Sequence, residues 1–316
     1  MTIQRLLLAG ALALLVPGSA GAATDSRIEG ADPGPDTTVT DSSGASSAPA
    51  ASADTVVAPQ VTVVQREHRN LGQRVVRAAG NFGSDCWYVA TSPTRLTLAG
   101  VAQLALVAGA EVAIYANDQA IMDAAQRNHD QPQLHAIHKF GDILEDAGFM
   151  PHTLEAEGGV WLIGAAFHSS TTQEICQELV EAHLIGGGIR NGLKILVGRA
   201  HPYEGRGSHV YEFGKGTSFP SGHTSIYFEA ATVLAHHAHW WPATVALYGM
   251  AGAGAIQRVQ ARSHWPSDVF LPIVSGTLIG FTVVHRNQGR RAKEATWTPQ
   301  IQASESGLRV GMGRRF

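Results

Sequence analysis

The chain has few cysteines, little net charge and no long apolar run. Its two cysteines, Cys86 and Cys176, could pair in an exported protein but are too few for a disulfide framework, so we favour free thiols. The formal net charge of -3 gives no reason to expect nucleic acid as a partner. The longest uncharged runs, residues 96–110, 242–257 and 269–284, each fall short of the roughly 20 apolar residues that cross a bilayer.

The amino terminus has the pattern of a secretory signal peptide. Arg5 precedes an apolar run over residues 6–16, and Ala20, Gly21 and Ala22 offer a small-residue cleavage site. Residues 23–60 are rich in Ala, Ser, Thr, Pro, Asp and Gly without an apolar period, which predicts a disordered tether. We therefore expect a leader over residues 1–22, a linker over 23–60 and an exported, periplasmic protein.

The remaining chain is poor in alternating β-rich runs, and its apolar periodicity is helical. The predicted helices cover residues 67–79, 94–116, 119–128, 133–146, 160–167, 172–184, 224–238, 243–258 and 267–285. This pattern predicts one all-α helical bundle domain over residues 61–290. A mean hydropathy of -0.01 favours a periplasmic or membrane-apposed body over an integral membrane protein.

A basic polar tail is expected over residues 291–316. The charge run that begins at Arg286 is typical of a solvated extension, and contact with anionic lipid head groups is the functional alternative. Residues 307–316 could form a lone strand. The sequence does not indicate an oligomeric state.

Three stretches of the predicted domain carry the chemistry. They are GLKILVGRAHP at residues 192–202, GTSFPSGH at 216–223 and QRVQARSHWPSD at 257–268. Pro266 suits the first turn of a helix, which places His264 at the mouth of that helix and Asp268 one turn on, on the same face. Cations, two histidines and a helix-entry turn together predict a phosphate site.

These stretches resemble the signature of the type 2 phosphatidic acid phosphatase superfamily, which includes bacterial acid phosphatases and vanadium haloperoxidases. The matching residues are Lys194, Pro202, Pro220, Ser221, Gly222, His223, Arg258, His264 and Asp268. Two positions depart from the pattern. Gln257 stands where the family has serine, and His201 stands where it has the arginine before the proline.

The chemistry of phosphate-ester hydrolysis assigns a role to each residue, and the resemblance implies the same roles. His264 is the expected nucleophile, Asp268 fixes its tautomer, and His223 is the general acid and base. The phosphate-binding candidates are Lys194, Arg258, Ser221, Gly222, Arg199 and His201. No metal or cofactor is expected. Histidine at position 201 carries its charge mainly in acid, which predicts a phosphate grip that weakens as the pH rises.

We therefore expect a metal-independent phosphomonoesterase that acts on a lipid phosphate or a small organic phosphate. Two other classes stay open. One is a vanadate-dependent haloperoxidase, in which vanadate would occupy the phosphate position. The other is a non-catalytic exported module that binds lipid.

Overall fold

The computed structural model describes residues 71–295, 297–304 and 307–314, so the expected leader and tether lie outside the described residues. Residues 71–295 confirm the all-α fold. Nine α-helices lie in this range: α2 (Leu71–Ala90), α3 (Leu98–Ala116), α4 (Asp118–Arg127), α5 (Pro132–Ile143), α6 (Met150–Ala166), α7 (Ser170–Val197), α8 (Gly222–Ala238), α9 (Trp241–Gln260) and α10 (Pro266–Ala295). Three short 3-10 helices connect them: η1 (Ser92–Arg95), η2 (Asp146–Gly148) and η3 (Pro202–Glu204).

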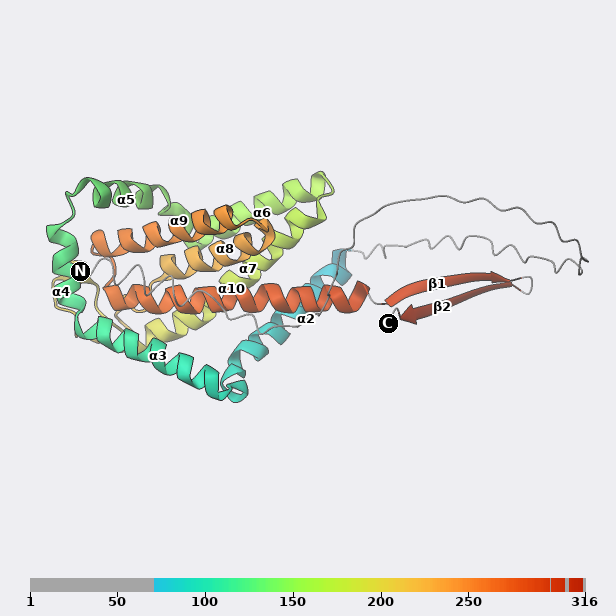
Figure 1. The fold of residues 1–316 in the computed structure, drawn as a ribbon, viewed down its shortest axis with the longest axis horizontal. Coiled ribbons are helices and arrows are strands. Elements are labelled where there is room, and N and C mark those ends of the chain that lie inside the picture. Colours follow the sequence, from blue (N-terminus) through green and yellow to red (C-terminus); the bar gives the residue numbers. More distant parts are fainter. Residues whose placement is uncertain (1–70, 296, 305–306, 315–316) are drawn as a thin grey trace, which may run out of the picture. The chain divides into compact units, whose positions relative to one another are not determined.

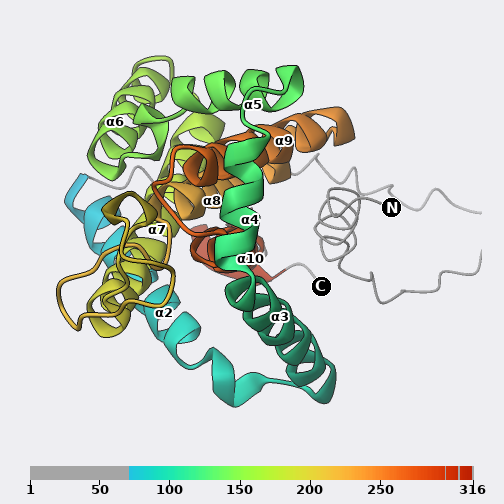
Figure 2. The same cartoon turned by 90° about the vertical axis from the view of Figure 1, so that its left-hand side faces the viewer.

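Helix α8 is the centre of the bundle and packs most extensively against α9 and α10, with α7 beside it (Figures 1 and 2). One buried cluster joins Val233 of α8 to Leu179 of α7 and Val283 of α10. A second cluster joins Phe228 of α8 to Ala255 of α9. Each large apolar side chain buried in this way contributes about 1.5–3 kcal/mol. The first cluster holds α7, α8 and α10 together, and the second holds α9 against α8.

Helix α7 is longer than the sequence predicts. The expected end at residue 184 precedes three glycines, Gly186 to Gly188, which usually weaken a helix. In the structure, a Cβ at Gly186 would lie 2.0 Å from Oε1 of Glu229. The glycine therefore lets α7 approach α8 closely around a buried charge, and α7 continues to Val197.

Helix α10 also runs past its predicted end, through the basic residues expected to be a solvated tail. Arg286 and Arg290 both pair with the buried Asp85 of α2, and Arg291 lies 2.7 Å from Glu174 of α7. These ion pairs hold the last turns of α10 against the bundle, so the expected domain limit at residue 290 falls inside a helix.

The carboxy-terminal segment forms a two-stranded antiparallel sheet rather than a lone strand. Strand β1 (Trp297–Ser304) pairs with β2 (Gly307–Arg314), with Trp297 opposite Arg314 and Ser304 opposite Gly307.

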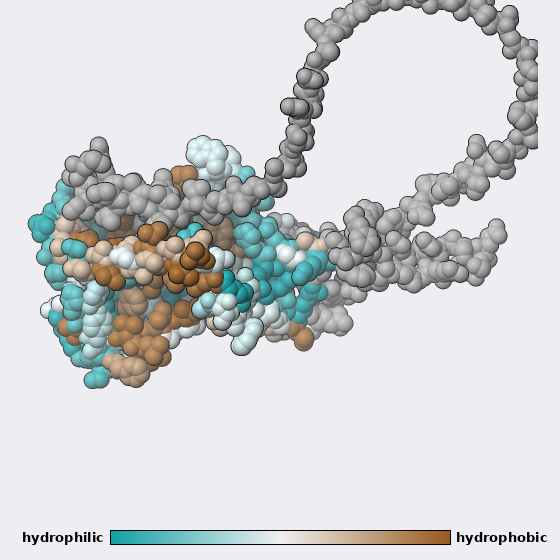
Figure 3. Space-filling view, turned by 60° about the horizontal axis from the view of Figure 1, so that its bottom comes forward, coloured by the Kyte–Doolittle hydropathy of each residue, from teal (hydrophilic) through white to brown (hydrophobic). Residues whose placement is uncertain are grey.

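Helix α3 is apolar around its circumference. Its side chains Leu98, Leu106 and Val112 are 88%, 67% and 64% exposed, and the face that contains them is largely hydrophobic (Figure 3). Two of the described helices, α3 and α10, are long and apolar enough to cross a membrane. The core helix of a soluble protein can have the same length and composition. In the apolar stretch of α10, 56% of the residues are buried, whereas α3 has half-buried and exposed residues and none that is fully buried.

Candidate active site

The three motif stretches meet at the end of the bundle where α7 stops and α8 and α10 begin (Figures 1 and 2). Gly198 ends α7 with a left-handed φ of 61°, and a Cβ at Gly216 would lie 2.2 Å from the Gly198 carbonyl oxygen. The two backbone segments therefore touch where only glycine fits. The Ser221 N–H donates to the Asp268 carbonyl at 2.8 Å, which joins the start of α8 to the start of α10.

Arg199 is buried in this loop, and the geometry does not support the direct phosphate contact expected of it. The side chain is 1% exposed, and its guanidinium donates to Asp268 Oδ1 at 2.7 Å and to Asp118 Oδ2 at 2.6 Å. It also donates to Ser267 Oγ at 2.7 Å and, from two nitrogens, to the Ser208 carbonyl at 3.0 and 2.7 Å. All three guanidinium nitrogens are engaged within the protein, so Arg199 positions α4 and α10 against the loop.

His264 lies just before α10 and is 6% exposed. Its Nδ1 lies 2.8 Å from the Ser218 carbonyl oxygen and 3.8 Å from Oδ2 of Asp268. A carbonyl oxygen only accepts, so Nδ1 carries the proton and the lone pair lies on Nε2. Ser218 therefore takes the place expected for Asp268 as the nearest acceptor. Burial lowers the pKa of His264 more than the charge of Asp268 raises it, so the ring is neutral.

Asp268 is fully buried and acts on His264 partly through Ser218. Its carboxylate accepts hydrogen bonds from the Ser218 hydroxyl, from the Trp265 N–H at 2.9 Å and from Arg199. The Ser218 hydroxyl therefore fixes the peptide whose carbonyl orients His264. Ser218 had no predicted role, although it lies in the same stretch as Ser221.

His223 is the second residue of α8, and its ring packs over Gly148 of η2. A Cβ at Gly148 would lie 2.4 Å from Cδ2 of His223 and 2.7 Å from the Tyr227 hydroxyl. Burial, followed by the charge of Arg258, lowers the pKa of His223 to about 4. The ring is therefore neutral in mildly acid solution when no anion is bound.

Replacing Gly148 with alanine is expected to displace His223 and to lower kcat for p-nitrophenyl phosphate by about 10- to 100-fold, because small misplacements of catalytic groups cost this much. The matched control is Gly158→Ala on α6, where a Cβ meets nothing within 4 Å. Steady-state kinetics of both variants provide the measurement. Equal kcat values would show that the contact with Gly148 does not position His223.

Arg258 carries a buried donor without a partner. Its Nε donates to Oε1 of Gln257 at 2.6 Å, and one terminal nitrogen donates to Glu145 at 3.2 Å. The other terminal nitrogen is buried with no hydrogen-bond partner among the described residues. Gln257, the first departure from the family pattern, also donates to Asp142 at 2.6 Å and so ties the guanidinium to α5. An orphaned buried N–H of a cation is suited to bind an anion.

Lys194 and the start of α8 supply further donors. Lys194 Nζ donates to the Thr217 carbonyl, and burial lowers the pKa of Lys194 to about 8 against the opposing effect of Asp268. Ser221 caps α8, with its hydroxyl accepting from the Thr224 N–H at 3.5 Å. The N–H groups of Gly222 and His223 precede the first intrahelical bond of α8, so they are suited to bind an anion.

His201, the second departure, lies beside the nucleophile candidate. Its ring centroid is 5.3 Å from that of His264, and it stacks on Tyr203 at 4.8 Å. Its Nδ1 lies 2.6 Å from the Ser263 carbonyl oxygen and its Nε2 lies 3.0 Å from the Thr217 hydroxyl. The ring therefore forms a wall of the site, with both nitrogens engaged.

At the other end of α8, Glu174, Glu178 and His237 bring three potential metal-ligand atoms within 4.8 Å of one another. Arg291 already lies 2.7 Å from Glu174 and 2.9 Å from Glu178, and His237 lies 2.7 Å from Glu178. The group is a partly buried network of ion pairs and hydrogen bonds that holds the histidine-rich end of α8 to α7 and α10.

A family model matches the part of the chain that carries the site. Residues 178–292, which contain every candidate site residue, match the PAP2 superfamily. The solved structure of Aquifex aeolicus LpxE is 21% identical, with a TM-score of 0.40, and covers 53% of this chain and 94% of its own. The first transmembrane PAP2 type phosphatidylglycerolphosphate phosphatase from Bacillus subtilis is 16% identical, with a TM-score of 0.40, and covers 58% of this chain and 96% of its own. No curated protein matches the chain. The part of the chain that carries the site, from within α7 to within α10, is therefore similar to the PAP2 superfamily.

Proposed function

We propose that this chain is a phosphatase that hydrolyses a phosphate monoester through a phosphohistidine on His264. The observation that carries the proposal is the hydrogen bond from His264 Nδ1 to the Ser218 carbonyl at 2.8 Å, which leaves the Nε2 lone pair available. The similarity to the PAP2 superfamily supports phosphatase activity in general. The unpartnered nitrogen of Arg258 and the first amides of α8 support an anion beside that lone pair.

The proposed reaction has two displacements. The Nε2 lone pair of His264 forms a bond to phosphorus while the bond to the ester oxygen breaks, and His223 gives a proton to the leaving alkoxide. His223 then takes a proton from water, whose oxygen bonds to phosphorus as the bond to Nε2 breaks. The products are an alcohol and inorganic phosphate. Lys194 and Arg258 offset the charge on the non-bridging oxygens in both steps.

Substrate binding is required to charge His223. Its pKa of about 4 in the free protein follows from burial and from the positive charge of Arg258. A phosphate dianion between the two groups offsets that charge and favours the imidazolium. His223 therefore becomes an acid when the substrate arrives.

The proposed substrate is a lipid phosphate or a small organic phosphate, and the protein is membrane-associated. The exposed apolar side chains of α3 support contact with a lipid phase (Figure 3). Export to the periplasmic side stays a prediction from residues 1–22, which lie outside the part of the chain that the structure describes.

Hydrolysis of p-nitrophenyl phosphate in the presence of EDTA tests the function. We expect turnover without added metal, with competitive inhibition by vanadate and phosphate, because the site would hold vanadate as a transition-state mimic. Loss of activity in EDTA that a divalent metal restores would contradict the mechanism. Bromide oxidation with vanadate and peroxide, without ester hydrolysis, would instead indicate a haloperoxidase.

The pH profile of kcat/KM is expected to fall as the pH rises through about 8. Lys194 has a pKa lowered to about 8, so it loses its proton and its attraction for phosphate over this range. Lys194→Arg keeps its charge. At pH 9 the Lys194 side chain of wild type is charged in only about a tenth of the molecules. We therefore divide kcat/KM at pH 9 by the value for the same protein at pH 7, and we expect this ratio to be about tenfold higher in Lys194→Arg than in wild type.

The control for this profile is Lys139→Arg, because Lys139 is exposed on α5 away from the motif stretches. Its profile should match wild type. If kcat/KM of Lys194→Arg still falls as the pH rises through about 8, a group other than Lys194 causes the fall.

A further inference from the structure

A small cavity shares a wall with the candidate active site. Its volume is about 190 Å³, and it is lined by Gly198, Ala200, His201, Tyr203, Glu204, Arg206, Glu212, Lys215, Gly216 and Thr217. His201 and Thr217 form the shared wall, because His201 lies 5.3 Å from His264 and the neighbour of Thr217, Ser218, holds the His264 ring. A group attached to a phosphate at His264 therefore has this cavity next to it.

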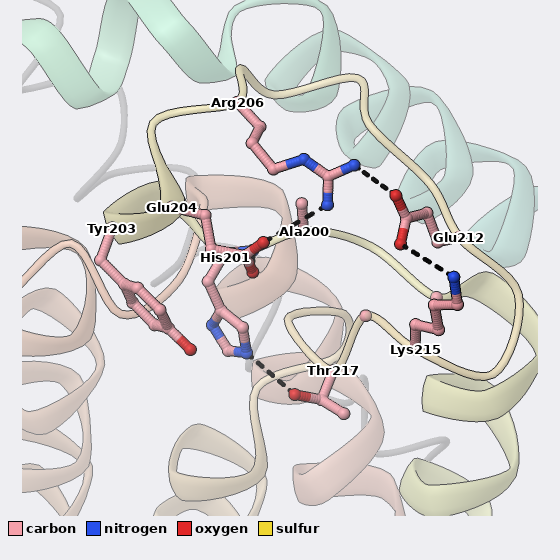
Figure 4. Close-up of a pocket in the computed structure, with 10 residues that line it drawn as sticks. Ala200, His201, Tyr203, Glu204, Arg206, Glu212, Lys215 and Thr217 are labelled. Atoms are coloured by element: carbon pink, nitrogen blue, oxygen red, sulfur yellow. Dashed lines mark hydrogen bonds and ion pairs between the residues drawn. The ribbon is translucent and has the colours of Figure 1, made fainter.

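Two cations converge on one carboxylate on the far side of the cavity. Arg206 and Lys215 reach Glu212 from two directions (Figure 4), Arg206 through a direct hydrogen bond and Lys215 at 3.9 Å. The Lys215 distance exceeds that of a hydrogen bond, so its ammonium donors are open to a ligand. The second acid, Glu204, lies 3.5 Å from Arg206 through one carboxylate oxygen, and its other oxygen accepts from the His201 N–H at 2.7 Å as part of a helix cap. Glu212 is therefore the acid that a ligand would have to displace.

Displacement of Glu212 costs little. The side chains of Arg206 and Glu212 are 42% and 39% exposed, and ion pairs at this exposure contribute little to stability. An anion from a substrate that is already held at His264 gains both cations at a high effective concentration. The cavity is also smaller than the roughly 300 Å³ of the smallest drug-sized pockets, so it fits a small substituent rather than an acyl chain.

We propose that Arg206 and Lys215 form a subsite for a second anionic group of the substrate, a carboxylate or a second phosphoryl group beyond the ester oxygen. The subsite rests on the proposed function, since it places the second group relative to a phosphate at His264. Glu212 occupies the two cations when no substrate is bound.

The test compares phenyl phosphate with its 3- and 4-carboxyphenyl analogues, measured as kcat/KM by phosphate release. Wild type is expected to prefer at least one carboxylated ester about threefold, and the Arg206→Gln/Lys215→Gln variant to hydrolyse both kinds equally. Glu212→Gln removes the competing carboxylate and should raise the preference about threefold. Lys139→Gln, an exposed lysine on α5, is the matched control and should leave the preference unchanged.

A wild-type enzyme without preference, or a preference that the double variant retains, would overturn the subsite while leaving the phosphatase function intact. Failure to hydrolyse any of the esters would instead refute the proposed function. Calorimetry with phenylphosphonate and its carboxylated analogues decides the subsite in that case, because it measures binding alone. Equal affinities in wild type would then overturn the subsite, and tighter carboxylate binding that the double variant loses would support it.

Discussion

Replacing His264 with alanine is expected to lower kcat for p-nitrophenyl phosphate by at least about 10⁴-fold, because loss of a nucleophile removes most of the catalysis that its supporting groups provide. His201 lies 5.3 Å away by ring centroid, but its two nitrogens are engaged by Ser263 and Thr217, so it does not replace the lost ring. Steady-state kinetics at pH 6 provide the measurement.

Two variants separate lost chemistry from lost folding. His264→Gln keeps an N–H that can donate to the Ser218 carbonyl but lacks the nucleophile, so it should fold and remain inactive. His135→Ala removes an exposed histidine of α5 and should keep wild-type activity. Ordinary activity in a folded His264→Ala protein would remove His264 from the mechanism.

Arg199→Ala is expected to lower the free energy of unfolding by about 3–5 kcal/mol. The substitution leaves the buried carboxylates of Asp118 and Asp268 without their cation, and an unpaired buried charge carries this penalty. Urea denaturation followed by tryptophan fluorescence provides the measurement. The control is Arg127→Ala at the exposed end of α4, which should cost less than about 1 kcal/mol.

This prediction separates two roles for Arg199. A phosphate ligand would give a variant of native stability with a raised KM, because only the contact with substrate would be lost. A positioning residue gives a loss of stability together with a loss of kcat, since Asp268 and the Ser218 peptide shift. Native stability in Arg199→Ala would return Arg199 to the phosphate site.

The resemblance to a known family predicted that the motif stretches, which lie far apart in the sequence, come together in the fold. The stretches at residues 216–223 and 257–268 do come together, with Ser221 N–H bonded to the Asp268 carbonyl at 2.8 Å. Local pattern alone could not separate Arg199 from His201, since both flank the same turn. The deciding partner of Arg199 is Asp118, which lies 81 residues earlier, and no local signal in the sequence connects them.

The apolar periodicity of the sequence predicted where the helices lie, but it did not predict several of their ends. Helix α6 starts at Met150, ten residues before the predicted start, with Pro151 in its first turn. Helix α7 passes through three glycines because the bundle needs a close approach at Glu229. Helix α10 extends through Arg286, Arg290 and Arg291 because buried acids on α2 and α7 pair with them. In each of the last two cases a tertiary contact outweighs the local propensity.

The packing of His223 against Gly148 could not be predicted for a related reason. Nothing in the sequence around η2 indicates that His223 packs against it, 75 residues later in the chain. A glycine is required at position 148 because the His223 ring of α8 occupies the space where a Cβ would lie. Gln257 is a similar case, because its bond to Asp142 of α5 appears only once α5 and α9 are packed.

Rapid-quench labelling is the most direct test of His264 as the nucleophile. Wild type is mixed with ³²P-labelled p-nitrophenyl phosphate, quenched within milliseconds in alkaline detergent and digested at alkaline pH, and the labelled peptide is identified by mass spectrometry. The proposed mechanism predicts an acid-labile, alkali-stable phosphate on His264, absent from His264→Ala. A burst of p-nitrophenol without label on His264, or label on another residue, would contradict it.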